Sequence, residues 1–177
     1  MLNIEELASI LGVGPLFDHF PATIRPCIQL SKNLHISSPE RIIGIAIMVA
    51  ATALRMTCYR YMQKNFTFEL AVKDGHRLVT DGPYAYVRHP AYLGGCGMII
   101  ASTLFNLGRG SWWAECAVQS GLQWRVLGML HVIWGMMFLH GTVARCSVED
   151  SVLKEQFKED WVRWAKRTQC RMVPYLF

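Results

Sequence analysis

The sequence predicts an all-α integral membrane protein, a multi-span helical bundle with a polar site at its cytosolic face that a C-terminal helix completes. Of its 177 residues, 52% are hydrophobic and only 18% are charged, and the mean hydropathy is +0.21. A typical soluble domain contains about 25% charged residues. Apolar runs alternate with polar stretches, and the basic residues gather in two of those stretches. We therefore expect one membrane domain over residues 1–177.

Residues 1–60 are predicted to supply the N-terminal membrane helices. The run 42–54, "IIGIAIMVAATAL", is short for a span, which needs about 20 mostly apolar residues. Arg55 and Arg60 can extend it, because long basic side chains reach from a helix end to water. Residues 4–30 are interrupted by prolines and charges, which predicts one or two broken or shallow helices. The acidic start "MLNIEELASILGVG" does not resemble a cleaved signal peptide.

A polar connection is expected over residues 61–95, and residues 91–144 are expected to hold two spans joined by an interfacial linker. The runs "AYLGGCGMIIASTLFNL" and "VLGMLHVIWGMMFLHGTVA" contain no Asp, Glu, Lys or Arg. Indole rings favour the boundary between lipid and water. The segment between the two runs contains Trp112, Trp113 and Trp124. It is therefore predicted to lie at the membrane surface.

Residues 145–177 are predicted to form a cytosolic C-terminal helix and tail, because of the distribution of positive charge. Of the 18 Lys and Arg residues, 13 fall in this tail or in the connection after the first span, and 5 fall on the other side. The 13 are Arg55, Arg60, Lys64, Lys73, Arg77, Arg88, Arg145, Lys154, Lys158, Arg163, Lys166, Arg167 and Arg171. The positive-inside rule places both regions in the cytosol, where they can meet.

The cysteines predict neither a disulfide framework nor a metal site. They form no C-x-x-C pair and have no histidine at metal-ligand spacing. Free cysteine usually packs as a small hydrophobic side chain, so we expect reduced, buried thiols. The six are Cys27, Cys58, Cys96, Cys116, Cys146 and Cys170.

The connection contains the motif "HRLVTDGPYAYVRHPAYLGG", residues 76–95. Its Asp-Gly-Pro sequence is a turn signal. His89 precedes a proline, which favours an extended backbone at His89. Pro90 itself suits the first turn of the helix that follows. The His89 ring is therefore expected at a fixed angle where the second span begins.

The tail contains a second candidate motif, Arg145 and Glu149. The two residues are four apart, so they lie on one helix face if the third span continues into the tail. A simple surface pair of this kind contributes only about 0.3–0.5 kcal/mol. The order with Arg first is the poorer one for such a pair, which favours a functional role.

The first motif resembles the signature of the isoprenylcysteine carboxyl methyltransferases. In that family a His-x-Leu-Val stretch, a Gly-Pro-Tyr turn and an Arg-His-Pro-x-Tyr element form most of the S-adenosylmethionine pocket. The tail "ARCSVEDSVLKEQFKEDWVRW" is similar to the family's Arg-x-x-x-Glu-Glu element, which is followed by Leu, Phe and paired aromatic positions. The resemblance covers about residues 60–177.

The resemblance implies methyl esterification, with S-adenosyl-L-methionine as cofactor, of the C-terminal carboxylate of isoprenylated cysteine in CaaX-processed proteins or peptides. It implies as partners an isoprenylated C-terminus and the lipid bilayer, with no nucleic acid and no metal. The implied location is the endoplasmic reticulum membrane for a eukaryotic source and the plasma membrane for an archaeal or bacterial one. The implied cofactor contacts are His76, Arg77, Leu78, Val79, Tyr84, His89, Pro90, Ala91, Tyr92 and Glu149. The implied catalytic residues are Arg145, which contacts the substrate carboxylate, and Glu149.

The sequence departs from the family pattern in three ways. Asp150 stands where the family has its second Glu, and Lys158 stands where a Gly usually follows the Phe. Eukaryotic members usually have more spans before the signature. Residues 1–60 must therefore supply the groove for the lipid.

The residues suit a reaction between a carboxylate and a sulfonium methyl. The carboxylate is already ionised at neutral pH, so no general base is needed. Opposite charges cancel in the transition state, so a poorly hydrated pocket favours the reaction once both reactants are placed. A guanidinium such as that of Arg145 holds a carboxylate in a fixed geometry, and Glu149 is expected to face the cationic cofactor.

Three alternatives to this function remain open. Membrane phospholipid N-methyltransferases have a similar Arg-His-Pro-x-Tyr-x-Gly core, although an amine acceptor has less need of Arg145. The chain can also be a shortened, non-catalytic paralogue that binds a membrane partner. Sterol reductases share the Arg-His element, usually beside Trp or Asn neighbours that this motif lacks.

Overall fold

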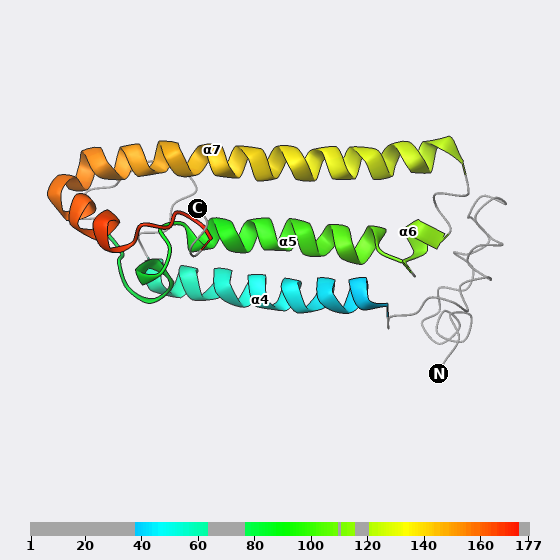
Figure 1. Ribbon diagram of the computed structural model, residues 1–177, viewed down its shortest axis with the longest axis horizontal. Helices are drawn as coiled ribbons and strands as arrows, with labels where there is room; N and C mark the ends of the chain where they lie inside the picture. The colour runs from blue at the N-terminus through cyan, green and yellow to red at the C-terminus, as the bar shows by residue number, and fades with distance from the viewer. Residues whose placement is uncertain (1–37, 64–76, 110, 116–120, 174–177) are drawn as a thin grey trace. The chain divides into compact units, whose positions relative to one another are not determined.

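The computed structural model describes residues 38–63, 77–109, 111–115 and 121–173 (Figure 1). Within these ranges every regular element is helical, in the order α4, a 3-10 turn (η3), α5, α6 and α7. Three of them, α4, α5 and α7, are long and apolar enough to cross a membrane. The predicted all-α membrane fold is confirmed. The helices expected in residues 4–30 and the predicted site residue His76 lie outside the described ranges.

Helix α4, Pro39–Met62, is longer at both ends than the predicted run 42–54. It begins at a proline, whose fixed φ suits the first helical position. Glu40 in the first turn and Arg60 in the last turn complement the helix dipole. The helix ends before Gln63, which has a left-handed φ of 46°.

Helix α5, Pro90–Leu107, coincides with the second predicted span and begins at the proline, as expected. The amide of Leu93 donates a 3.2 Å hydrogen bond to the carbonyl of His89, so His89 immediately precedes the first turn of the helix. A short helix, α6 (Trp112–Glu115), follows in the predicted interfacial linker.

Helix α7, Leu122–Arg167, contains the third predicted span and continues through the tail without a break until a kink. Arg145 and Glu149 therefore lie on one continuous helix, as predicted. The kink falls at Lys158, with φ 44° and ψ −111°. Glycine adopts this region far more readily than other residues, because a Cβ atom crowds the backbone there. The resemblance predicts glycine at this position, so Lys158 occupies a backbone conformation that suits the residue it replaces.

The chain forms two compact units, each built from two separate segments. The first unit consists of Met1–Ile45 and Ser102–Ile133, and the second consists of Ala46–Ala101 and Trp134–Phe177. The long helices α4, α5 and α7 each contribute to both units.

Within the first unit, one contact joins the start of α4 to the end of α5, and another joins α6 to the start of α7. The Arg41 guanidinium lies 4.6 Å from the centre of the Phe105 ring. Trp113 and Trp124 pack edge to face with their ring centres 5.8 Å apart. Paired tryptophans at the linker are consistent with its predicted place at the membrane surface.

Within the second unit, small residues let α5 pack closely against both α4 and α7 (Figure 1). A Cβ atom added at Gly97 of α5 would lie 3.1 Å from the Cβ of Ala51 on α4. One added at Gly135 of α7 would lie 3.2 Å from Ile99 of α5. Close approach of this kind replaces the hydrophobic effect as the source of helix association in lipid.

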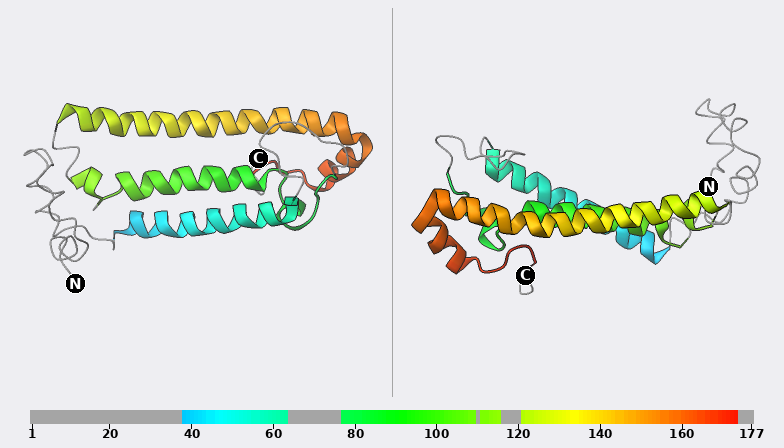
Figure 2. Two further views of the ribbon diagram at one scale, coloured as in Figure 1. Left: turned by 180° about the vertical axis from the view of Figure 1, so that it is seen from behind. Right: turned by 90° about the horizontal axis from the view of Figure 1, so that it is seen from above.

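Two small apolar cores hold the second unit together, and both involve the C-terminal segment. The first is formed by Cys58, Tyr84 and Trp164, and the second by Cys96, Cys146 and Met172. After the kink, α7 turns back and the tail runs toward the start of α5 (Figure 2). The tail is therefore part of the packed structure.

The buried thiols predicted from the sequence are found at Cys58, Cys96 and Cys146. All three lie in the cores just described, and none is in a disulfide. Cys170 is only partly buried, because it lies in the tail. Cys27 and Cys116 fall outside the described residues.

Candidate functional site

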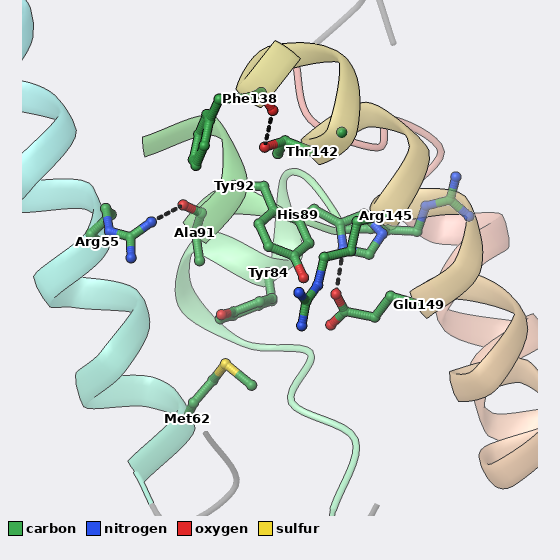
Figure 3. A pocket seen from close by; sticks show the side chains of 12 residues that line it. Arg55, Met62, Tyr84, His89, Ala91, Tyr92, Phe138, Thr142, Arg145 and Glu149 are labelled. Atoms are coloured by element: carbon green, nitrogen blue, oxygen red, sulfur yellow. Dashed lines mark hydrogen bonds and ion pairs between the residues drawn. The ribbon is translucent and has the colours of Figure 1, made fainter. Parts of the chain in front are cut away.

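A cavity of about 450 Å³ opens in the second unit between α4, the start of α5 and α7 (Figure 3). This volume is within the range of small-molecule sites, roughly 300–1,000 Å³. The residues that line it are Arg55, Met62, Tyr84, Arg88, His89, Ala91, Tyr92, Phe138, Gly141, Thr142, Arg145 and Glu149. Segments that are distant in sequence, the connection and the tail helix, therefore meet as predicted.

The wall formed by α7 changes from apolar to charged along the helix. Phe138 lies at one end of the lining, followed by Gly141 and then Arg145 and Glu149. Thr142 also lines the cavity, and the other four lining residues of α7 follow one another at intervals of three or four positions, so those four share one helix face. A molecule with a charged group at one end and an apolar remainder would match this order.

The turn before α5 places Tyr84 in the cavity. Gly82 has a φ of 60°, and a Cβ atom there would overlap the ring of Tyr61, so only glycine fits this turn. The indole nitrogen of Trp164 donates a 3.0 Å hydrogen bond to the carbonyl of Tyr84, which fixes the turn against α7. Burial raises the pKa of the Tyr84 phenol, so the hydroxyl stays neutral at physiological pH.

The tail pairs with the backbone just before α5 and so holds the His89 ring in place. The amide of Arg88 donates to the carbonyl of Cys170 at 3.0 Å, and the amide of His89 donates to that of Arg171 at 2.7 Å. The hydroxyl of Thr168 donates to the carbonyl of Ala85 at 3.2 Å. These bonds give the Arg-His element a rigid position at the edge of the cavity.

Asp150 connects this element to α7 through a buried charge cluster. Its Oδ1 lies 3.0 Å from Nε2 of His89. Its Oδ2 lies 3.5 Å from a terminal nitrogen of Arg88 and 3.6 Å from Nε of Arg171. The carboxylate thus fixes the orientation of the His89 ring and offsets two positive charges.

Glu149 and Arg145 meet Tyr92 on the opposite side of the histidine. The Tyr92 hydroxyl is close enough to both side chains for hydrogen bonding, and Figure 3 shows the three pointing toward one another. Nδ1 of His89 lies 3.9 Å from Oε2 of Glu149, which is longer than a hydrogen bond. The rings of His89 and Tyr92 stack with centres 5.7 Å apart.

Three residues that line this cavity each have a buried polar atom without a hydrogen-bond partner among the described residues. The atoms are Oε2 of Glu149, the hydroxyl oxygen of Tyr84 and Nε of Arg88. A buried polar atom without a partner is costly, and native proteins usually satisfy such atoms with protein, water or ligand. The two oxygens therefore indicate where a polar or cationic ligand would bind.

A narrower cavity of about 70 Å³ extends the site toward the start of the described connection. It shares Met62, Tyr84, Arg88 and Glu149 with the larger one. Its other walls are Arg77, Leu78, Val79, Leu153, Phe157 and Trp164. Both cavities are therefore lined by charged as well as apolar side chains.

Most of the residues proposed from the sequence are brought together here. Tyr84, His89, Ala91, Tyr92, Arg145 and Glu149 line the larger cavity, and Arg77, Leu78 and Val79 line the narrower one. Pro90 is fully buried and lines neither, because it begins α5. His76 lies outside the described residues.

Sequence reasoning missed Arg55 and the role of Asp150. Arg55 was treated only as the polar end of a span, yet it donates a 3.1 Å hydrogen bond to the carbonyl of Ala91 in the cavity wall. Asp150 was noted only as a departure from a family pattern. The feature of the sequence that could have indicated its role is its position next to Glu149, a predicted site residue.

Comparison with known proteins gives one match. The model of the isoprenylcysteine carboxyl methyltransferase (ICMT) family matches residues 43–128, which include most of α4, the turn, α5, α6 and the first residues of α7. The match ends before Arg145 and Glu149. No curated protein and no solved structure matches the chain.

Proposed function

Because residues 43–128 match the model of the isoprenylcysteine carboxyl methyltransferase family, we propose that the chain transfers a methyl group from S-adenosylmethionine to the C-terminal carboxylate of an isoprenylated cysteine. The observation that supports this acceptor best is the order of side chains along α7. Arg145 and Glu149 stand at one end of the lining and Phe138 at the other. An isoprenylcysteine has the same order, a carboxylate followed by a long apolar chain.

The cavity residues suit a cationic cofactor. Oε2 of Glu149, which accepts no hydrogen bond from the described residues, supplies negative charge, and the stacked rings of His89 and Tyr92 supply aromatic surface beside it. Cations are attracted both to carboxylates and to the faces of aromatic rings. The neutral hydroxyl of Tyr84 offers a further hydrogen bond. The narrower cavity adjoins the larger one at Tyr84 and Glu149, which places Leu78 and Val79 beside the cofactor side of the site.

When bound, S-adenosylmethionine supplies an electrophilic methyl group on a sulfonium centre. The acceptor carboxylate is the nucleophile and is ionised at neutral pH, so the protein need not remove a proton. Arg145 binds and orients the carboxylate through its planar guanidinium. Tyr92 contacts both Arg145 and Glu149 and thereby fixes the position of the proposed acceptor-binding residue relative to the proposed cofactor-binding residue. The remaining contribution is exclusion of water by the buried walls around His89.

The site is proposed to face the cytosol, in the endoplasmic reticulum membrane. The cofactor is water-soluble and the acceptor chain is lipid-soluble, so the reaction needs a site at the boundary of the two phases. The cavity lies beside the ends of α4 and α5 that continue into the basic connection. By the positive-inside rule such a connection remains in the cytosol.

An amine acceptor fits the cavity less well. It offers no carboxylate to the guanidinium of Arg145, which lines the cavity. Transfer to a phospholipid amine, or binding without catalysis, is therefore an outcome that the experiment must distinguish.

The test uses purified protein in detergent with labelled S-adenosylmethionine and two acceptors, N-acetyl-S-farnesylcysteine and phosphatidylethanolamine. We expect label in the farnesylcysteine alone. Arg145→Ala should reduce the transfer about hundredfold, because orientation of the nucleophile is lost, while cofactor binding survives. Arg145→Lys should restore only part of the rate, since a single ammonium lacks the planar fork.

Glu149→Ala provides the matched comparison on the cofactor side and should weaken S-adenosylmethionine binding itself, measured by calorimetry. Label in phosphatidylethanolamine, or wild-type transfer rates in Arg145→Ala, would contradict the proposed acceptor. Absence of transfer to either acceptor with intact cofactor binding would indicate a non-catalytic protein.

A further inference from the structure

Gly141 differs from the other glycines in the described helices. A Cβ atom added at Gly94 or Gly97 of α5, or at Gly135 of α7, would lie between 2.6 and 3.2 Å from a neighbouring helix. At Gly141 the added atom would meet nothing within 4 Å. Close helix packing therefore explains the first three glycines and does not explain Gly141.

Backbone geometry does not explain Gly141 either. Within the described part of α7, the non-helical φ and ψ angles occur at Lys158, and α7 is regular around Gly141. Glycine in a helix interior costs about 1 kcal/mol relative to alanine. Gly141 therefore carries this cost without allowing close helix packing or a turn. We expect it to have another role.

Gly141 lines the candidate site between its apolar end and its charged end. Phe138 precedes it by three positions and Arg145 follows it by four, so the three share one face of α7. Trp134 lies one turn further along the same face, and its ring contacts that of Phe138 with centres 6.0 Å apart. The distance along the helix from Trp134 to Arg145 is about 16 Å.

We propose that Gly141 is a specificity-determining residue that sets the width of the passage by which the isoprenoid chain of the acceptor leaves the charged part of the cavity. This inference rests on the proposed function. An isoprenoid has a methyl branch on every fourth carbon of its chain and is therefore wider than a straight alkyl chain. The missing side chain leaves room for the branches beside α7, and the chain then continues along Phe138 and Trp134.

The test compares Gly141→Leu with Ala144→Leu. Ala144 is exposed on the same turn of α7 and does not line the cavity, so it controls for a bulky substitution in this helix. Gly141→Leu should raise the KM for N-acetyl-S-farnesylcysteine by about tenfold or more, the effect of a few methylenes in a pocket. It should also weaken direct binding of a fluorescent S-prenylcysteine. Ala144→Leu should leave both unchanged, and both variants should bind S-adenosylmethionine normally.

A second variant covers the case in which leucine at position 141 disturbs folding. Gly141→Ala favours the helix, and it should lower the ratio of kcat/KM for S-farnesylcysteine to that for straight-chain S-dodecylcysteine. An unchanged ratio in Gly141→Ala, or wild-type KM and binding in a folded Gly141→Leu, overturns the inference. Wild-type protein that neither binds nor methylates farnesylcysteine overturns the proposed function instead.

Discussion

Replacing Asp150 by alanine should both destabilise the protein and weaken cofactor binding. The Asp150 side chain is 9% exposed and those of its partners Arg88 and His89 are 11% and 3% exposed. Removing one member of a buried charge pair costs about 3–5 kcal/mol, because the other charge remains buried without compensation. The Arg171 side chain is 37% exposed, so water screens its share of the interaction. We therefore expect a loss near the lower end, about 3 kcal/mol.

Thermal unfolding in detergent should show this as a decrease in Tm of about 6–12 °C for a chain of this length. S-adenosylmethionine affinity, measured by calorimetry below the unfolding temperature, should fall about tenfold, equivalent to about 1.4 kcal/mol. The physical reason is that the 3.0 Å contact to Nε2 no longer fixes the ring of His89. A purely structural role for Asp150 would lower Tm and leave the affinity unchanged.

Two conservative variants separate the effect of the Asp150 charge from the effect of the side-chain shape. Asp150→Asn keeps the shape and a hydrogen-bonding group but removes the charge, so it should recover part of the affinity and little of the stability. Asp150→Glu introduces the residue expected from the family pattern, and the longer side chain should retain charge pairing with Arg88. An alanine variant that matches wild type in both Tm and affinity would refute the reasoning about this cluster.

Three further predictions concern topology, the cofactor and the kink. Asp74→Cys and Glu159→Cys should be labelled from the same side of sealed vesicles, and labelling from opposite sides would contradict a shared cytosolic site. His89→Ala should weaken S-adenosylmethionine binding in a folded, membrane-inserted protein, and unchanged calorimetric affinity would remove His89 from the cofactor site. Lys158→Gly should raise stability by about 1 kcal/mol because the backbone there is strained for lysine, and a lower Tm would show that the lysine side chain matters more.

The spans and their order were predictable because lipid imposes a strong composition rule. An apolar run without charges identified α5 and the membrane part of α7, and the proline at position 90 identified where α5 begins. The first span was predicted too short. Its ends contain Glu40 and Arg60, which hydropathy counts as polar although both suit the ends of a helix.

The candidate site was predictable only where the polar motif was continuous in sequence. His89 and Tyr92 stand in one motif, and a four-residue spacing linked Arg145 to Glu149. Arg55 is separated from these residues by a whole connection, and only the packing of α4 on α5 brings it to the cavity. Side-chain pairing between helices depends on their relative rotation, which periodicity in one chain segment does not determine.

The tail that pairs with Arg88 and His89 also has a consequence for biosynthesis. The backbone partners of these two residues lie at Cys170 and Arg171, and Met172 fills the core beneath α5. Tyr84 of the polar motif is translated 80 residues before Trp164, its hydrogen-bond partner in the folded protein. A nascent chain therefore holds its first motif at the cytosolic surface of the membrane, without its final partners, until the tail leaves the ribosome. We expect the pocket to form only after residues 168–172 have been translated. Until then, the backbone amides of Arg88 and His89 lack the hydrogen-bond partners that they have in the folded protein.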